Sequence, residues 1–179
     1  MSVFVGTDIG SYMASESALR PATITAGAGN DNVAVTGTIV DRLAVNNGHV
    51  HRSAKLTLQF RAVLAQAETL TVAASLLDAA VSNFASGSAT LIALRARYKT
   101  DGGTWTAITL VSGAVPTTTI ATGPTGGGTV AGMVELDYNL DGARQYLRPT
   151  VTTNLSASGT DTSSIGGVLA FGGADEMPA

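Results

Sequence analysis

The sequence contains no cysteine and little charge. Without cysteine, the chain can form no disulfide, no thiolate metal site and no cysteine nucleophile. Aspartate, glutamate, lysine and arginine make up 13% of its 179 residues, against roughly 25% in an average globular chain. The formal net charge of −3 excludes the strongly basic surface that nucleic-acid binding requires. We therefore expect a chain stabilised by packing or assembly, with no nucleic-acid partner.

Long hydrophobic runs are also missing. No apolar run approaches the roughly 18 residues of a membrane-spanning helix. The first ten residues lack the basic start and longer apolar core of a signal peptide. We expect a soluble protein that is made in the cytosol and has no membrane partner, and the length suits one main domain.

Alanine, threonine, glycine and valine dominate instead, and they occur in alternating runs that favour strands. The clearest run is 55–65, where leucines, Phe60 and alanine share one face and polar side chains share the other. The stretch 68–76 alternates in the same way. Because only Gln66 and Ala67 separate the two runs, we predict that they form a hairpin.

A second hairpin is predicted where Asp101-Gly102-Gly103 joins 91–99 to 104–111, because glycine supplies the backbone angles of tight turns. Further strands are expected at 130–138, 145–153 and 165–171, with weaker ones at 22–25 and 37–45. Eight to ten short strands predict an all-β fold, an antiparallel β-sandwich that is jelly-roll-like.

Three segments do not read as strands. Residues 73–84 have apolar residues at helical spacing, which indicates a helical turn or an insertion between strands. Residues 116–128 contain prolines and many glycines and are expected to be a loop. Residues 1–20 lack alternation, so we predict an extended N-terminal arm there and the sandwich domain over 21–179.

Two motifs resemble metal sites and are better explained otherwise. His49 and His51 would share one face of a strand, but a third ligand is missing, so surface histidines are expected. Residues 137–142 match the first half of a calcium-binding EF-hand loop, but Arg148 stands where the loop needs glutamate. We interpret residues 139–142 as a strand-to-strand turn and expect no cofactor and no metal.

Arginine and lysine alternate with other residues at Arg95, Arg97 and Lys99, which puts three cations on one strand face. That face can meet an acidic partner or be solvated. No Gly-x-Ser-x-Gly nucleophile motif occurs, and the two histidines lie almost side by side in sequence, so we expect no enzyme activity; a small hydrolase is the weakest alternative.

Four short motifs stand out: the opening Gly-Thr-Asp-Ile-Gly at 6–10, the Asp41-Arg42 pair, the Leu-Ser-Ala-Ser-Gly-Thr-Asp-Thr run at 155–162 and the Gly-Gly-Ala-Asp sequence at 172–175. Together they resemble a family of small structural proteins encoded beside capsid genes in tailed bacteriophages and prophages. The similarity covers most of 22–178.

The resemblance implies a virion component of the capsid decoration, or cement, type. Such proteins are often β-sandwiches that assemble as homotrimers on the head, so the implied partners are the major capsid protein and other copies of the chain. In the predicted arm, six residues are expected to contact the capsid or a neighbouring protomer. They are Val3, Phe4, Val5, Ile9, Tyr12 and Met13.

A second hypothesis is a receptor- or carbohydrate-binding module of a phage tail or fibre. Sandwich folds are common in that role, and exposed aromatic rings can stack on sugars. Four residues are candidates for such stacking: Tyr98, Trp105, Tyr138 and Tyr146.

Overall fold

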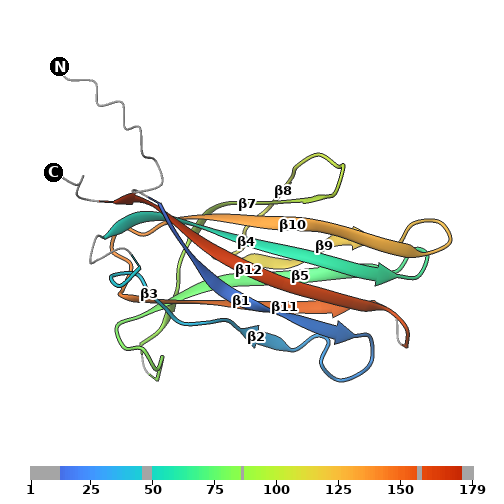
Figure 1. The fold of residues 1–179 in the computed structure, drawn as a ribbon, viewed down its shortest axis with the longest axis horizontal. Coiled ribbons are helices and arrows are strands. Elements are labelled where there is room, and N and C mark those ends of the chain that lie inside the picture. The colour runs from blue at the N-terminus through green and yellow to red at the C-terminus, as the bar shows by residue number, and fades with distance from the viewer. Residues whose placement is uncertain (1–12, 46–49, 86, 157–158, 175–179) are drawn as a thin grey trace, which may run out of the picture.

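The computed structural model describes residues 13–45, 50–85, 87–156 and 159–174, and all of its regular structure is β-strand. Figure 1 shows the strands in two layers, with both described ends of the chain at the same end of the molecule. The strands are β1 (Ala14–Thr25), β2 (Ala34–Thr36), β3 (Val40–Asp41), β4 (His51–Leu64), β5 (Thr69–Ala79), β6 (Ala89–Thr90), β7 (Ala93–Thr100), β8 (Thr106–Ile108), β9 (Val115–Thr122), β10 (Gly128–Asn139), β11 (Tyr146–Leu155) and β12 (Thr162–Ala174).

The strands form two antiparallel sheets. Sheet A has the order β1-β12-β4-β10-β7-β8, and sheet B has the order β2-β11-β5-β6, with β3 also paired to β11 and β9 to β5. Most consecutive long strands therefore lie in opposite sheets. The predicted all-β antiparallel sandwich is confirmed.

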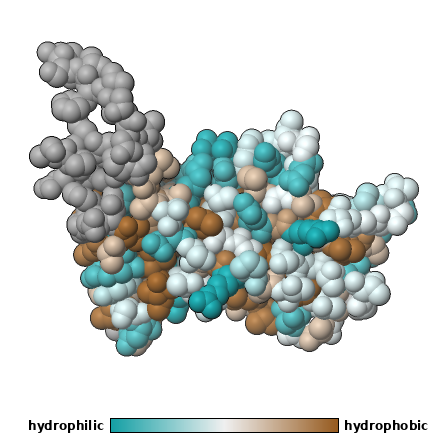
Figure 2. Space-filling model, viewed as in Figure 1, coloured by the Kyte–Doolittle hydropathy of each residue, from teal (hydrophilic) through white to brown (hydrophobic). Residues whose placement is uncertain are grey.

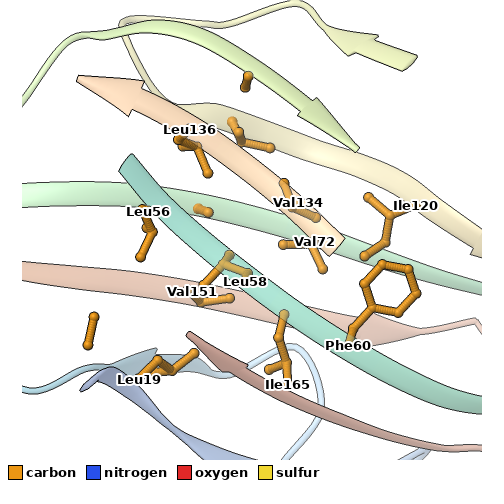
Figure 3. Packing of buried hydrophobic residues seen from close by; sticks show 14 of the residues in the cluster. Leu19, Leu56, Leu58, Phe60, Val72, Ile120, Val134, Leu136, Val151 and Ile165 are labelled. Atoms are coloured by element: carbon orange, nitrogen blue, oxygen red, sulfur yellow. The ribbon is translucent and has the colours of Figure 1, made fainter. Parts of the chain in front are cut away.

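The core lies between the two sheets and follows from alternation along the strands. From Ala54 to Leu64 of β4 the side chain at every second position is buried, as predicted for 55–65. Leu58 of β4 and Val151 of β11 are both almost completely buried. Figure 3 shows them among side chains from both sheets that converge in the space between the layers. Burial of these alternating apolar faces is the main force that holds the layers together.

The described part of the predicted arm is a strand. Ala14 to Arg20 form the first half of β1, which pairs with β12 and continues through Pro21. The pairing shifts register twice, so the neighbours Ala18 and Leu19 are both buried. These β-bulges hide the alternation that identifies a strand, and the domain boundary predicted at residue 20 therefore falls inside β1. Residues 1–12 lie outside the described residues.

The predicted helical turn at 73–84 is wrong. Strand β5 continues to Ala79, and its buried side chains keep the spacing of two expected of a strand. The sequence pattern looks helical because the adjacent Leu76 and Leu77 are both apolar, although they lie on opposite faces of β5. Asp78 also faces inward, where its carboxylate accepts a hydrogen bond of 2.8 Å from the backbone N–H of Arg144.

The predicted hairpin between 55–65 and 68–76 is also wrong. Strand β4 pairs with β10 and β12 in sheet A, whereas β5 belongs to sheet B. The short connection crosses from one layer to the other, where the N–H of Ala67 donates to the carbonyl of Gly123. A two-residue link is compatible with either geometry, so its length does not decide between them.

The loop predicted at 116–128 is partly a strand, because β9 occupies Val115–Thr122. Pro116 is tolerated for two reasons. It lies at the beginning of β9, and β5 is the one described strand with which β9 pairs. By contrast, the second predicted hairpin is confirmed: β7 pairs with β8, and Gly102 in the turn has a φ of 73°.

Tyr138 provides a pH-dependent test of the core. Its side chain is 1% exposed, and desolvation by burial raises the pKa of its phenol well above the usual value of about 10. Unfolding frees the phenol to ionise, so its contribution to stability is complete below about pH 10 and is lost as the pH rises further. Urea unfolding at about pH 8 and pH 11 should show a smaller alkaline loss for Tyr138→Phe than for the wild type. Equal alkaline losses for Tyr138→Phe and the wild type would contradict this role of the buried phenol.

Candidate interaction surfaces

The outer face of sheet A carries a ladder of charged side chains. Asp137 and Glu135 of β10 lie between basic residues of β4 and β7. The Nε of Arg95 lies 2.9 Å from Asp137 Oδ2, and the Nε of Arg97 lies 2.9 Å from Glu135 Oε2. Lys55 on the other side approaches both carboxylates, at 3.3 and 3.4 Å. The basic strand face predicted from sequence is thus paired with acids on its own sheet.

Positive charge still predominates on this face. It carries five of the ten lysines and arginines of the chain, because Arg61 and Lys99 also point outward. With two carboxylates, the face has an excess of three positive charges on a chain whose net charge is −3. Beside the ladder, the Arg97 guanidinium lies 4.1 Å from the centre of the Trp105 ring, and the Lys99 ammonium lies 5.1 Å from it. The face therefore suits an acidic partner.

Glu135 is the central acid of the ladder, and its side chain is only 14% exposed. Glu135→Gln removes a charge that faces both Lys55 and Arg97, so we expect a loss of about 1 kcal/mol in the free energy of unfolding. Urea unfolding measures it, and added salt should reduce the difference. Asp101→Asn in the exposed β7–β8 turn is the matched control and should change little. Equal stability of the Glu135→Gln variant and the wild type would contradict the pairing.

A groove of about 630 Å³ opens on the same face over β1, β12 and β4. The groove exists for two reasons. Gly166 points outward and has no side chain to fill the space, and it pairs with Gln59 of β4 but with no residue of β1. A Cβ on Gly166 would lie 3.0 Å from the Pro21 ring. Leu19, Phe60 and Val168 contribute apolar surface to the groove, and Arg61 is its one charged lining residue.

The outer face of sheet B is different, because it has almost no charge. On β5 and β11, the two adjacent central strands, every second side chain is half-buried and points away from the core. These ten residues form the face that we call the neutral face. They are Thr69, Thr71, Ala73, Ser75, Leu77, Tyr146, Arg148, Thr150, Thr152 and Asn154.

Arg148 is the one charged residue of the neutral face, and its guanidinium lies 4.2 Å from the centre of the Phe84 ring. A solvated strand face normally carries lysine and glutamate at such positions. Figure 2 gives the wider picture of the surface in one view: pale, weakly polar residues cover much of it between small hydrophilic and hydrophobic patches. The sparse charge of the chain is therefore distributed unevenly, and the neutral face has the least.

The predicted arm contacts lie almost entirely outside the described residues. Of the six, Met13 is described, and it is 54% exposed at the start of β1. The residues Val3, Phe4, Val5, Ile9 and Tyr12 fall in 1–12, so their role stays a prediction.

Of the predictions made for the two metal-like motifs, the one for His51 is wrong and the one for residues 139–142 is confirmed. His51, expected at the surface, is fully buried, and its ring centre lies 5.5 Å from that of Phe171; His49 lies outside the described residues. The turn predicted after β10 is confirmed, because Asn139 Oδ1 accepts a hydrogen bond of 2.9 Å from the N–H of Asp141, and Gly142 has a φ of 76°. In the part of the chain that the structure describes, no three potential metal ligands gather.

The four aromatic candidates for sugar stacking do not lie together in one site. Tyr138 is a core residue, so it offers no stacking surface. Trp105 is half-buried beneath Arg97, and Tyr98 and Tyr146 are half-buried in sheets A and B respectively. Within the described ranges, no helix is long and apolar enough to cross a membrane.

No protein-family model and no curated protein matches the chain. Among solved structures, it has a weak similarity to a chain of turnip yellow mosaic virus, with 10% identity, a TM-score of 0.25, and coverage of 93% of this chain and 97% of the other. Two infectious bursal disease virus structures, of the Gt strain and of derived T=1 particles, have 12% and 9% identity and TM-scores of 0.24 and 0.26. They match 89% and 91% of this chain but only 41% and 40% of their own. All three of these structures are of viruses.

Proposed function

We propose that this chain is a structural protein of a bacteriophage particle that decorates the capsid. In this proposal it bridges neighbouring major capsid subunits, acts as a homotrimer, is located on the surface of the virion and catalyses no reaction. The observation that carries the proposal is the neutral face of sheet B, because the centres of protein interfaces are depleted in charge.

The strand order supports a role of this kind. The strands β1-β12-β4-β10 face β2-β11-β5-β9, and the β7–β8 hairpin extends sheet A. We propose that the fold is a jelly roll, in which successive strands pass back and forth between two four-stranded sheets, and this strand order supports that reading. Jelly rolls occur in viral capsid proteins and also in lectins.

The mechanism requires only binding. A protein that binds the assembled shell but not separated subunits stabilises the shell by mass action, in proportion to its affinity and concentration. The neutral face would cover a weakly polar surface of the shell or of a sister subunit, and little charge would have to be desolvated there. The charged outer face of sheet A would remain available for a second, acidic contact.

Particles encoded by the same genome provide the test. Purified particles should contain the chain in a fixed ratio to the major capsid protein when both are quantified by mass spectrometry. Particles made without its gene should have shells that rupture at a lower temperature, and addition of the purified chain should restore the wild-type value. Absence of the chain from the particles would refute the proposal.

A further inference from the structure

The groove over Gly166 contains a positive charge without a negative partner. Arg61 is exposed at its rim, and among the described residues no carboxylate lies within ion-pair distance of its guanidinium. The nearest ladder acids, Glu135 and Asp137, pair with Lys55, Arg95 and Arg97 instead. The groove therefore suits an occupant that is mostly apolar and carries one carboxylate.

One segment of this chain has that composition. Residues 1–12 include six large apolar or aromatic residues, and Asp8 is their one charged side chain. The segment joins β1 at Met13, and β1 itself forms one wall of the groove. We propose that the groove binds residues 1–12 of a second copy of this chain, with the Asp8 carboxylate paired to the Arg61 guanidinium.

The length of the chain favours a second copy over the same copy. Ala14 pairs with Phe171, and Phe171 pairs with Ala54 of β4. Arg61 lies seven residues further along β4, about 23 Å at 3.3 Å per residue, and two strand spacings away from β1. Asp8 precedes Ala14 by six residues, which span at most about 22 Å between Cα atoms in a straight line, so the same copy reaches Arg61 only with a nearly extended arm and with the help of both side chains.

The direction of β1 makes the distance harder to cover. The strand runs from Ala14 toward the level of Arg61, where Thr23 pairs with Ser164 and Ser164 with Arg61. An arm of the same copy would therefore have to turn back over its own strand to approach Arg61. Residues used in such a turn add nothing to the reach, so the arm of a second copy is the favoured occupant.

Arm exchange of this kind has a consequence for assembly. Two copies that exchange arms reciprocally form a closed dimer, whereas one-way exchange is heterologous and closes into a ring only if the rotation between copies permits it. The inference rests on the self-assembly that the proposed function contains, and it assigns the two surfaces that meet.

Engineered cysteines test the contact directly, because the natural sequence has none. Thr7→Cys lies next to Asp8, and Ser164→Cys lies in the groove opposite Arg61. When the two single-cysteine full-length proteins are mixed and mildly oxidised, we expect a disulfide-linked heterodimer on a non-reducing gel, since disulfides form only between nearby Cα atoms. Thr7→Cys mixed with Thr152→Cys, on the neutral face, is the matched control and should give far less.

Two results of this experiment would overturn the proposal. One is that Thr7→Cys cross-links to Ser164→Cys no more than it does to the Thr152→Cys control. Absence of cross-linking in both mixtures counts as this result. The other is a disulfide within single chains carrying both Thr7→Cys and Ser164→Cys, under conditions where the mixed variants give none, because that result assigns the groove to the arm of the same copy.

Charge exchange tests the ion pair. In sedimentation equilibrium, Asp8→Arg or Arg61→Asp alone should weaken self-association by at least about fivefold, and the double variant should restore it. Asp101→Arg and Arg144→Asp, both at exposed residues outside the groove, are the matched controls and should leave it unchanged. No effect of either single reversal, or failure of the double variant to recover, would refute the pair. Neither experiment uses a shell, so failure here is distinct from absence of the chain from particles.

Discussion

Thr152→Lys should remove the protein from the shell while leaving it folded. Thr152 is half-buried near the middle of the neutral face on β11 and points away from the core. A lysine there can keep its ammonium in water in the free protein, so we expect a change in folding stability within about 0.5 kcal/mol. In the assembled state the same charge would be desolvated without a partner, which should weaken binding at least about tenfold.

Thr129→Lys is the matched control for this experiment. Thr129 is exposed on β10 and points outward on sheet A, so the same substitution adds a charge to the opposite face. Occupancy is measured as the ratio of this chain to the major capsid protein in particles assembled with each variant. If Thr152→Lys occupied the shell as fully as the wild type, the neutral face would not be the binding surface.

Leu58→Ala should have the largest effect on folding. Leu58 is fully buried in β4, which lies between β12 and β10 near the middle of sheet A, and a Cβ on neighbouring Gly167 would lie only 2.7 Å from its side chain. Truncation leaves a cavity between the sheets, so we expect a loss of about 2–5 kcal/mol in the free energy of unfolding. For a domain of ordinary stability that loss is a large fraction of the total.

The neighbouring residue is a control for Leu58. Thr57 lies on the outer face of sheet A, so Thr57→Ala changes the same strand without opening the core. Urea unfolding should show a loss several times smaller for Thr57→Ala than for Leu58→Ala. Similar losses at both positions would contradict the assignment of the buried face of β4.

The sequence predicts strands well where alternation is complete. In β10, in β11 and in β4 from Ala54 onward, buried positions are separated by one outward position, so the pattern of the chain and the pattern of burial coincide. It fails where register or composition breaks the alternation. Two bulges in β1 bury Ala18 and Leu19 together, and Asp78 occupies an inward position in β5 that an apolar residue normally fills.

The partners of the strands are less accessible from sequence than the strands themselves. The Gln66-Ala67 link looks like a hairpin turn but crosses between sheets, since the pairing of β4 is decided by β10 and β12, far away in the chain. The groove depends on the register of Gly166 against Pro21, which only the paired strands define. The neutral face could be anticipated from the shortage of charge, but its location could not.

Cryo-electron microscopy of particles encoded by the same genome is the most direct test of the capsid-decoration proposal. The account predicts density for the two-sheet fold on the outside of the shell, with Thr71, Ala73 and Thr152 of the neutral face covered by a capsid subunit or a sister copy. Particles whose shell lacks this density, or in which the neutral face is open to solvent, would contradict it.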